Sequence, residues 1–401
     1  IAGILGVITM LGMDQISELA INMYGGSTKF ALIAIPMFVL AGAIMNVGGI
    51  TARLFTFAAA LVGHFRGGLA HVNVATSVLF GGMIGTSVAD LAGTGSVIIP
   101  SMKERGYPAP FAAALSASSS GIGPLLPPSS PMILYSAVTG VSLSSLFLAG
   151  VVPGLLIGLS LIAFIYVIAM RRDYGVLTTQ SVAEWASDFR QAFKRAALPL
   201  LIPVIVLGGI YGGIFTPTEA AVVSVFYAMV LGIGVYRTIG VGDLPKILAD
   251  SALTSAIVLI IVGFASVFAY ALSIHQVPQT LAAQIIAISS NPFVFLLMVN
   301  IVLLLVGMFI ETLAAVIVVT PILAPIAVSL GIDPIHFGIV VIVNLAIGMV
   351  TPPVGVNLFI VSQIADTPIE RLIKPLLGFM GVLVIDLLLI SYLPLVMGQL
   401  L

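Results

Sequence analysis

Long, unbroken apolar segments run through this chain from one end to the other, and they constrain its fold more than any other feature. A bilayer-spanning helix needs about 20 such residues. The segments of about this length are 29–47, 146–170, 197–213, 217–236, 250–272 and 375–397. Only 7% of the residues are charged, against about 25% in soluble domains. Spanning strands would alternate apolar and polar residues, which these segments do not. The sequence therefore predicts an all-α polytopic membrane protein.

The composition excludes several classes of function. The 14 basic residues are scattered over a chain of net charge −1, so there is no clustered basic face for nucleic acid. The absence of cysteine excludes disulfides, iron–sulfur clusters and thiolate metal sites. The histidines never sit at metal-ligand spacing, and we expect them in loops or at the membrane interface; they are His64, His71, His275 and His336. No G-x-x-x-x-G-K-[ST] loop is present, so ATP is not the direct fuel and no cofactor is expected.

The most polar stretch is residues 171–196, with five basic and three acidic side chains. Trp185, Phe189 and Phe193 recur every four residues, so one face of a helix there would be aromatic. Such a helix would lie flat among the lipid headgroups; an ordinary linker is the alternative. The basic residues favour a cytoplasmic location in either case. At the start of the chain, the apolar run 1–13 is shorter than a span, and we expect part of the first helix to be missing from this sequence.

Two stretches of the chain share one plan. Residues 122–128 read IGPLLPP, and residues 347–353 read IGMVTPP. Upstream of each lies an acid, and we match Asp90 with Glu311. The apolar segments around these motifs are short: 72–86, 93–103, 109–121 and 131–140 in the first stretch, and 294–310, 313–329, 334–348 and 357–365 in the second. The sequence therefore predicts an internal repeat.

Both motifs interrupt a helix, because proline removes a backbone donor and clashes with the preceding turn. Unwound backbone at membrane depth is tolerated only where it lines a cavity or is buried in protein. Exposed carbonyls there can coordinate a cation, and the N-termini of half-helices can face an anion. Paired interruptions in two halves of a chain therefore point to the central site of a transporter. The similarity alone leaves open whether the two repeats are parallel or inverted.

The polar residues around the interruptions supply candidate ligands, and their oxygen-rich, sulfur-free character suits a hard cation such as sodium. They are Thr86, Ser87, Asp90, Ser116, Ser118, Ser119, Ser120, Ser129 and Ser130 in the first repeat, and Glu311, Thr312, Asn344, Thr351 and Asn357 in the second. A carboxylate at the bilayer centre costs about 3 kcal/mol or more, so Asp90 and Glu311 should face protein or a wet cavity. Two other acids have no repeat counterpart and stay outside the site. We expect Asp386 to serve helix packing and Glu219 to cap a helix N-terminus.

These motifs together resemble the large membrane subunit of tripartite ATP-independent periplasmic (TRAP) transporters. The matching segments are GTSVADLAGTGSVIIPSMKERGY at 85–107, SSSGIGPLLPPSSPMILY at 118–135, GGIFTPTEAA at 212–221 and GMVTPPVGVNLF at 348–359. The resemblance implies a multi-pass protein of a bacterial inner membrane that couples sodium entry to import of an organic acid, such as sialic acid or a C4-dicarboxylate. It also implies two partners besides membrane lipid: a periplasmic binding protein that delivers the acid, and a separate small four-helix membrane subunit.

The resemblance further implies two inverted repeats, each with a re-entrant hairpin and a broken helix, in an elevator-type transporter with a scaffold and a transport domain. The implied division has scaffold helices over 1–65, a first transport repeat over 66–140 (hairpin 72–105, broken helix 109–140), scaffold helices over 141–290 with a polar arm at 171–196, a second transport repeat over 291–366 (hairpin 294–329, broken helix 334–365) and a C-terminal helix over 367–401.

Carried over by position, the resemblance also implies site residues. One sodium site would use Thr86, Ser87, Asp90, Ser119, Ser120 and Gly123. The other would use Glu311, Thr312, Gly348, Val350, Thr351 and Gly355. The substrate would lie between them, near Ser87, Asp90, Ser129, Ser130, Glu311 and Asn357.

Three other interpretations compete with this one. A stand-alone sodium/dicarboxylate symporter of similar architecture would need no binding protein. An intramembrane enzyme would use Asp90 and Glu311 as an acid–base pair. A channel or a pure scaffold subunit would not accumulate a solute. We predict a transporter and not an enzyme.

Overall fold

A computed structural model describes residues 16–172, 181–288 and 290–400, and every regular element within them is a helix. The first half comprises α2 (Ile16–Ser27), η2 (Phe30–Ile33), α3 (Ala34–Val47), α4 (Ile50–Val62), α5 (Gly68–Ile84), α6 (Ser87–Asp90), η3 (Leu91–Gly95), α7 (Ser96–Glu104), α8 (Ala109–Ser120), α9 (Ser130–Thr139) and α10 (Leu143–Arg172). The second half comprises α11 (Val182–Tyr211), α12 (Pro217–Met229), η4 (Val230–Val235), η5 (Val241–Asp243), α13 (Leu244–Ile274), α14 (Val277–Ile288), α15 (Pro292–Phe309), α16 (Thr312–Ser329), α17 (Pro334–Gly348), α18 (Val356–Ala365) and α19 (Ile369–Leu400). The opening run 1–13, where the sequence predicts a shortened helix, lies outside the described residues.

Eight stretches of helix in the described residues are long and apolar enough to cross a membrane. They are Phe30–Val47, Leu143–Arg172, Ala183–Tyr211, Pro217–Val235, Val241–Ile274, Pro292–Phe309, Thr312–Ser329 and Ile369–Met397. The segments that the sequence predicts as full-length spans coincide with six of them. The hairpin helices α15 and α16, which the sequence places among the short segments, also reach spanning length.

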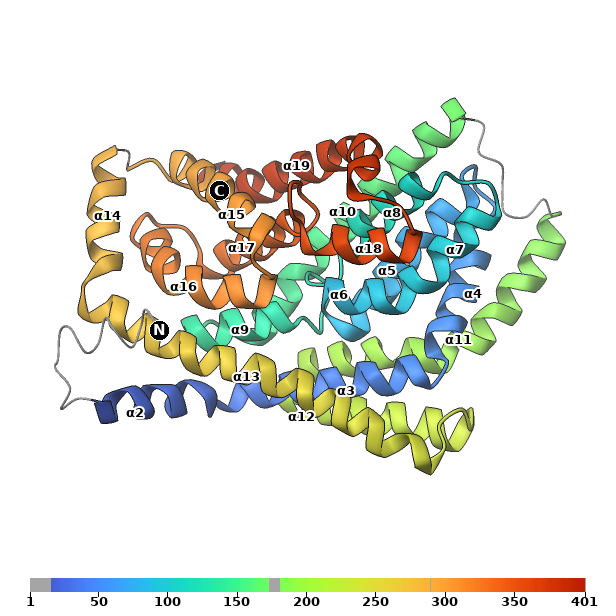
Figure 1. The fold of residues 1–401 in the computed structure, drawn as a ribbon, viewed down its shortest axis with the longest axis horizontal. Coiled ribbons are helices and arrows are strands. Elements are labelled where there is room, and N and C mark those ends of the chain that lie inside the picture. Colours follow the sequence, from blue (N-terminus) through green and yellow to red (C-terminus); the bar gives the residue numbers. More distant parts are fainter. Residues whose placement is uncertain (1–15, 173–180, 289, 401) are drawn as a thin grey trace.

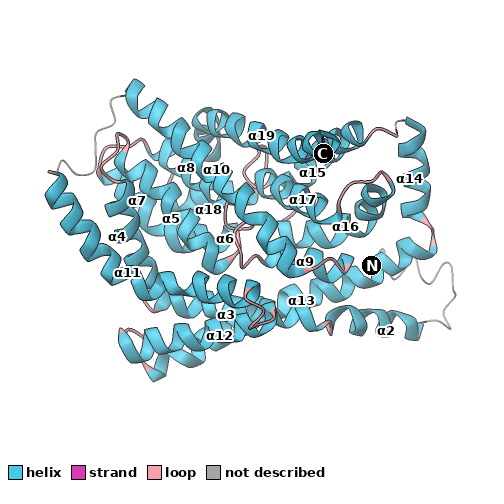
Figure 2. Cartoon of the chain, turned by 180° about the vertical axis from the view of Figure 1, so that it is seen from behind, coloured by secondary structure: helices cyan, strands magenta, loops and turns pink. Residues whose placement is uncertain are grey.

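The chain contains two repeats of the same order of elements. In each, a hairpin (α5 with α6, η3 and α7; α15 with α16) precedes a broken helix (α8 and α9; α17 and α18) and a long helix (α10; α19). The packing is exchanged between the repeats, since α2 contacts α13 while α12 contacts α3. The equivalent helices α4 and α14 lie at opposite ends of the long helices (Figures 1 and 2). The repeats are therefore inverted, and the fold class expected from the sequence is confirmed.

Glycine pairs bring each hairpin against its broken helix. A Cβ on Gly81 of α5 would lie 3.0 Å from Gly123 Cα, and a Cβ on Gly307 of α15 would lie 2.9 Å from Gly348 Cα. Small residues let helix backbones approach closely in a membrane, where association depends on packing and not on the hydrophobic effect. In both repeats the hairpin thus crosses the broken helix at an equivalent glycine near the start of the break.

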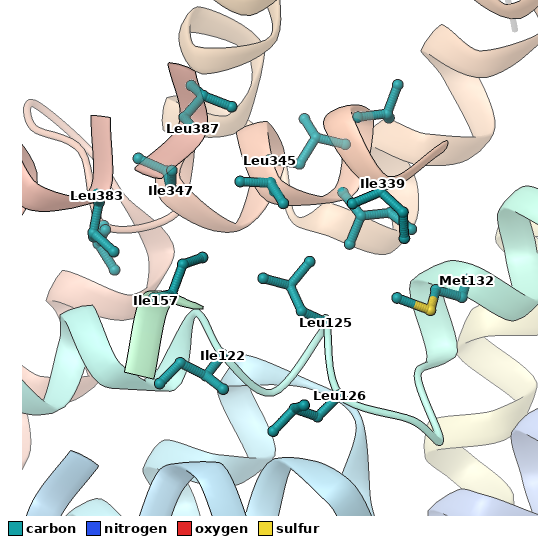
Figure 3. Packing of buried hydrophobic residues seen from close by; sticks show 14 of the residues in the cluster. Ile122, Leu125, Leu126, Met132, Ile157, Ile339, Leu345, Ile347, Leu383 and Leu387 are labelled. Carbon is teal, nitrogen blue, oxygen red and sulfur yellow. The ribbon is translucent and has the colours of Figure 1, made fainter. Parts of the chain in front are cut away.

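The first interruption, residues 121–129, is called break 1, and the second, residues 349–355, break 2. Break 1 is buried throughout, and its apolar side chains point into the core. Figure 3 shows Leu125 projecting toward Leu345 of α17. A Cβ on Gly154 of α10 would lie 2.7 Å from Leu126 Cδ2. Break 2 is less covered, because Pro353 is exposed.

The contacts of α10 differ from the expected division of the chain. The sequence assigns 141–290 to the scaffold, but α10 packs against α5, α9, α17 and α19, which all belong to the hairpins and broken helices or follow them. The small residues Gly150 and Gly154 of α10 lie over break 1 and leave no room for a larger side chain. We therefore group α10 with the repeats; the rest of the division into scaffold and transport domain stays a prediction.

The polar arm at 171–196 is helical from Val182 onward, while residues 173–180 lie outside the described part. The described part of the arm is a helix and not an extended linker, and it is continuous with the apolar segment that follows, since α11 runs from Val182 to Tyr211. A position flat among the headgroups stays a prediction. The aromatic face packs against α4: Phe57 lies 5.7 Å from Phe189 and 6.0 Å from Phe193, measured between ring centroids. Trp185 Nε1 donates to Ala60 O at 2.9 Å. The aromatic periodicity thus marks a helix–helix contact.

The glycine crossings predict a position-specific loss of stability. Gly307→Ala should lower the melting temperature of the detergent-solubilised protein, because overpacking a tight contact costs about 1–3 kcal/mol. Gly381→Ala in α19 is the matched control, since a Cβ there meets nothing within 4 Å. It should be neutral or slightly stabilising. Equal melting temperatures for both variants in a fluorescence-detected thermal assay would contradict the crossing.

Candidate functional site

The tips of the two hairpins meet the two breaks at one place in the molecule. We define the tip of the first hairpin (tip 1) as 85–90 and that of the second (tip 2) as 310–312. The hydroxyls of Ser87 in tip 1 and Thr312 in tip 2 both donate to the sulfur of Met349 in break 2, at 3.5 and 2.8 Å. Asn357 Nδ2 of α18 donates to Ser120 Oγ of α8 at 3.1 Å. Segments from the two halves of the chain therefore meet at one place, as the sequence predicts.

Each hairpin also accepts a backbone hydrogen bond from the end of its break or from the residue that follows it. Ser130 N donates to Gly85 O at 3.4 Å, and Gly355 N donates to Met308 O at 2.9 Å. Gly85 has a positive φ of 69°, and a Cβ there would lie 2.0 Å from Pro128 O, so only glycine fits this turn. In both breaks the peptide bond within the Pro-Pro pair is cis.

The expected match of Asp90 with Glu311 is wrong. Glu311 is the N-cap of α16, where its carboxylate accepts from Leu313 N at 2.8 Å and from Ala314 N at 3.4 Å. The N-cap of α6 is Thr86, whose Oγ1 accepts from Ala89 N. Thr86 and Glu311 are separated along the chain by the same interval as Gly123 and Gly348. Asp90 lies one turn further along, because a helix N-terminus accepts either a hydroxyl or a carboxylate as its cap.

The first candidate sodium site lies where tip 1 meets break 1. A Cβ on Gly123 would lie 3.2 Å from Thr86 O and 3.3 Å from Ser120 O, so two carbonyl oxygens converge on this glycine. Asp90 is buried; its Oδ1 accepts from Thr94 Oγ1 at 2.9 Å, and its Oδ2 has no hydrogen-bond partner among the described residues. A buried carboxylate oxygen without a donor is costly unless a cation compensates it.

A network of buried hydroxyls and an amide supports the helices around this site. Ser119 Oγ donates to Asn73 Oδ1 at 3.1 Å and accepts from Ser77 Oγ at 3.1 Å, and Asn73 Nδ2 donates to Ser116 Oγ at 2.6 Å. These bonds join α5 to α8. The second repeat has an equivalent link between α15 and α17, in which Asn344 Nδ2 donates to Asn300 Oδ1 at 2.8 Å.

The second candidate sodium site lies where tip 2 meets break 2. A Cβ on Gly355 would lie 2.9 Å from Met349 O and 3.1 Å from Thr351 O. Thr351 Oγ1 donates to Ile347 O at 2.8 Å, which leaves its oxygen able to accept or to coordinate. The backbone of Gly348 is fixed by Gly307 as described above, and Val350 is buried. Carbonyl oxygens thus also gather at this break.

A cavity of about 440 Å³ lies between both tips on one side and α3 and α13 on the other. Its polar lining residues are Asn46, Thr86, Ser130, Thr254 and Glu311, and no Lys or Arg is among the described residues that line it. A larger cavity of about 740 Å³ lies between α9, α13, α14 and α16; the described residues that line it carry no charge and belong to neither tip. The smaller cavity is therefore the candidate substrate site.

The cavity separates the predicted substrate residues into two groups. Ser130 and Glu311 line it. Ser87, Asp90, Ser129 and Asn357 do not, and each is buried. Ser129, for example, donates to Pro124 O at 2.5 Å and caps the N-terminus of α9.

Sequence reasoning missed the residues of α3 and α13 that face the tips, Asn46 and Thr254. Asn46 has a sequence signal, because it is the one uncharged polar side chain in the apolar run 29–47. It also missed Asn73 and Met349, which link elements within the site.

The two acids that the sequence keeps out of the site serve structural roles. Asp386 of α19 accepts from Ser160 Oγ of α10. Glu219 forms a capping box, in which its carboxylate accepts from Thr216 N at 2.8 Å and Thr216 Oγ1 accepts from Glu219 N. Both expectations are confirmed.

Two of the histidines bond backbone carbonyls, His71 to Arg66 O and His336 to Ile390 O. His71 is buried in α5 instead of lying in a loop or at the interface.

Comparison with known proteins decides the family. The model of the tripartite ATP-independent periplasmic transporter family, DctM component, matches residues 1–396. The chain belongs to this family. As a member of the DctM family it is a multi-pass inner-membrane transporter component and not an enzyme, and its relatives are permeases.

Several relatives of this DctM family member carry substrate names. The C4-dicarboxylate TRAP transporter large permease protein DctM of Pseudomonas aeruginosa is 41% identical over 98% of this chain and 91% of that protein. The sialic acid TRAP transporter large permease protein SiaM of Vibrio cholerae is 43% identical over 97% of this chain and 90% of that protein. The isethionate TRAP transporter permease protein DctMQ of Oleidesulfovibrio alaskensis is 40% identical over 96% of this chain and 60% of that protein.

One solved structure shares the fold. The crystal structure of the Alcanivorax borkumensis YdaH transporter superposes with a TM-score of 0.66, at 16% identity, over 95% of this chain and 89% of that one. This likeness concerns the fold alone.

The meeting of the two breaks predicts a specific cross-link. Because the chain has no cysteine, the pair Ser120→Cys and Asn357→Cys can be introduced alone, and it should join under mild oxidation, since the two native side chains are in contact. Protease cleavage between the repeats followed by gel electrophoresis would detect the link. The pair Ser120→Cys and Ser362→Cys, displaced by more than a helical turn along α18, is the control and should stay unlinked.

Proposed function

We propose that this chain couples the entry of sodium ions to the import of an organic acid. The observation that carries the proposal is the meeting of both tips and both breaks beside a cavity whose far wall is formed by α3 and α13. A ligand in this cavity would contact the repeats on one side and α3 and α13 on the other. The site offers oxygen ligands for cations and helix N-termini for an anion, which a coupled transporter needs together.

Two sodium sites fit the geometry. At the first, Ser119, Ser120 and the carbonyls that converge on Gly123 provide neutral oxygen ligands, and Asp90 provides the charge. At the second, Thr351 and the carbonyls near Gly355 provide ligands beside Thr312 and Glu311. Hydroxyl, carbonyl and carboxylate oxygens are the donors that hard cations prefer. Each sodium ion that enters contributes about 2.3 kcal/mol per 100 mV of membrane potential, so two of them more than offset the charge of a monoanionic acid.

The acid would lie in the cavity against the N-terminus of α9. Ser130 is the first residue of that helix and lines the cavity, so the positive end of the helix dipole faces the ligand. Both helix N-termini are capped, α9 by the neutral hydroxyl of Ser129 and α16 by the carboxylate of Glu311, whose negative charge repels an anion. An anion therefore favours the α9 side. Relatives are named for C4-dicarboxylates, for sialic acid and for isethionate, so the identity of the acid stays open among such organic acids.

The mechanism we infer is an elevator. The cavity lies on a boundary between the two repeats, which carry the tips and breaks, and α3 and α13, which pack on each other and on α12 and α2. Sliding the repeats along this boundary would carry the site from one side of the membrane to the other. The inverted repeats support this, because exchanging their conformations produces an opposite-facing state.

Two partners complete the proposed system, a periplasmic binding protein that delivers the acid and a small membrane subunit. The family name specifies a tripartite, periplasmic system, and the relative DctMQ, of which this chain covers 60%, is long enough to hold a further subunit. Uptake in proteoliposomes tests the whole proposal. Labelled acid should accumulate only with an inward sodium gradient, the small subunit and the binding protein. Uptake by this chain alone would favour the stand-alone symporter, and turnover of the acid in detergent would favour an enzyme.

The first sodium site predicts the effect of removing its charge. Asp90→Asn should raise the sodium concentration for half-maximal uptake about fivefold or more, because it removes a charge–charge attraction worth about 1 kcal/mol or more at contact distance. Asp386→Asn removes an equally rare intramembrane acid outside the site and should leave the sodium dependence unchanged. Both are measured in proteoliposomes at matched protein abundance. A shift of the sodium dependence by Asp386→Asn but not by Asp90→Asn would show that Asp90 is not a ligand of the first sodium site.

The neutral ligands give a second prediction for the same assay. Ser119→Ala and Thr351→Ala should each weaken sodium activation more than they lower protein abundance, since each removes one oxygen ligand. Ser160→Ala, which removes a hydroxyl outside both sites, is the control. Wild-type sodium dependence in both site variants would show that the assigned coordination shells are wrong.

A further inference from the structure

One side chain of α3 enters the candidate substrate cavity from the side opposite the tips. Asn46 lies in the last turn of α3, is exposed, and lines the cavity together with Ser130 and Glu311. The other polar lining residue from that side, Thr254 of α13, donates its hydroxyl to Asp250 O at 3.0 Å. Asn46 therefore presents an uncommitted polar group from the wall that α3 and α13 form.

The orientation of Asn46 is fixed by its neighbours. Thr51, a buried residue of α4, donates its hydroxyl to Asn46 Oδ1 at 3.2 Å. The same oxygen lies 3.7 Å from the position of a Cβ on Gly93 in η3. With the carbonyl side of the amide held between α4 and η3, the NH₂ side is the part left to bond a ligand.

An anion in this cavity needs hydrogen-bond donors, and the lining offers few. Glu311 only accepts, so on the side of the tips and α9 the side-chain donors are the hydroxyls of Thr86 and Ser130. Within the part of the chain that the structure describes, no Lys or Arg lines the cavity. The Asn46 amide, across from the Ser130 end of α9, is thus the donor that faces the acid from α3.

We infer that Asn46 donates a hydrogen bond to the bound organic acid and is a specificity-determining residue of the permease. The inference rests on the proposed function, because it requires an acid in this cavity. It adds a prediction of its own. Asn46 sits on α3 while Ser130 and Glu311 sit on the repeats, so a displacement of the repeats along α3 breaks this contact. Asn46 therefore holds the acid in the arrangement described here and releases it when the repeats move.

Single-cysteine labelling tests the contact without relying on transport. The purified complex with the small subunit carries Asn46→Cys as its only permease cysteine, because the native chain has none. It is treated with the anionic thiol reagent 2-sulfonatoethyl methanethiosulfonate in saturating sodium. Succinate, N-acetylneuraminate and isethionate are each added in turn, and the one that wild type takes up should slow labelling at least fivefold. Asn22→Cys on α2, whose amide bonds Glu18 O within its own helix, is the control and should label at the same rate with or without acid.

Kinetics separate recognition from folding. Asn46→Asp keeps the shape of the side chain but replaces the donor by an acceptor, and should raise the KM for the acid about tenfold or more. Its sodium half-saturation and abundance should match wild type. Thr51→Val removes the hydroxyl that orients Asn46 at nearly constant volume and should raise KM in the same direction by a smaller factor.

The outcomes distinguish the role of Asn46 from the proposed function. Unprotected Asn46→Cys together with wild-type KM in Asn46→Asp and Thr51→Val would overturn the role of Asn46 while sodium-driven uptake persists. Absence of sodium-driven uptake of all three acids by the wild-type complex would overturn the proposed function itself, and with it the premise for Asn46.

Discussion

The structure depends on one constraint: backbone groups freed by a broken helix cannot be left without partners at membrane depth. Most backbone donors of the breaks bond the preceding turn, and at the end of each break one further donor bonds the hairpin of the same repeat. Ser130 N finds Gly85 O, and Gly355 N finds Met308 O. The hairpins reach the breaks because Gly81 meets Gly123 and Gly307 meets Gly348 without side chains between them. The candidate site thus lies where the hairpins pack against the breaks.

The scarcity of charge makes the few buried polar groups informative. In a chain with so little polar surface, the carboxylate of Asp90 and the serines of α8 gather where tip 1 meets break 1. The second repeat reproduces the backbone but not the acid at this position, since Glu311 serves as a helix cap and faces the cavity. The two repeats therefore share one architecture but place their negative charge differently. Glu311 of the second repeat lines the cavity, whereas Asp90 of the first repeat is buried away from it.

Errors of the sequence interpretation have definite physical causes. The match of Glu311 with Asp90 rests on both being acids in apolar runs, but the true partner of Glu311, Thr86, shares only the ability to cap a helix, which hydroxyls and carboxylates both do. The aromatic spacing of Trp185, Phe189 and Phe193 predicts a helix with one apolar face, and a helix is what the described residues form. Whether lipid or α4 covers that face does not follow from periodicity.

The sequence by itself determined the all-helical membrane fold, the repeat and the two interruptions, because hydropathy, proline and glycine act locally and need no knowledge of the rest of the chain. It also marked most residues that surround the interruptions. Only the tertiary structure decided which of these share a cavity. Ser130 and Glu311 face it while Ser129 and Asn357 are turned into the protein, and Asn46 arrives from a helix that no motif connects to the site. Side-chain direction at a break and contact between distant helices are set by packing in three dimensions, which the order of residues does not display.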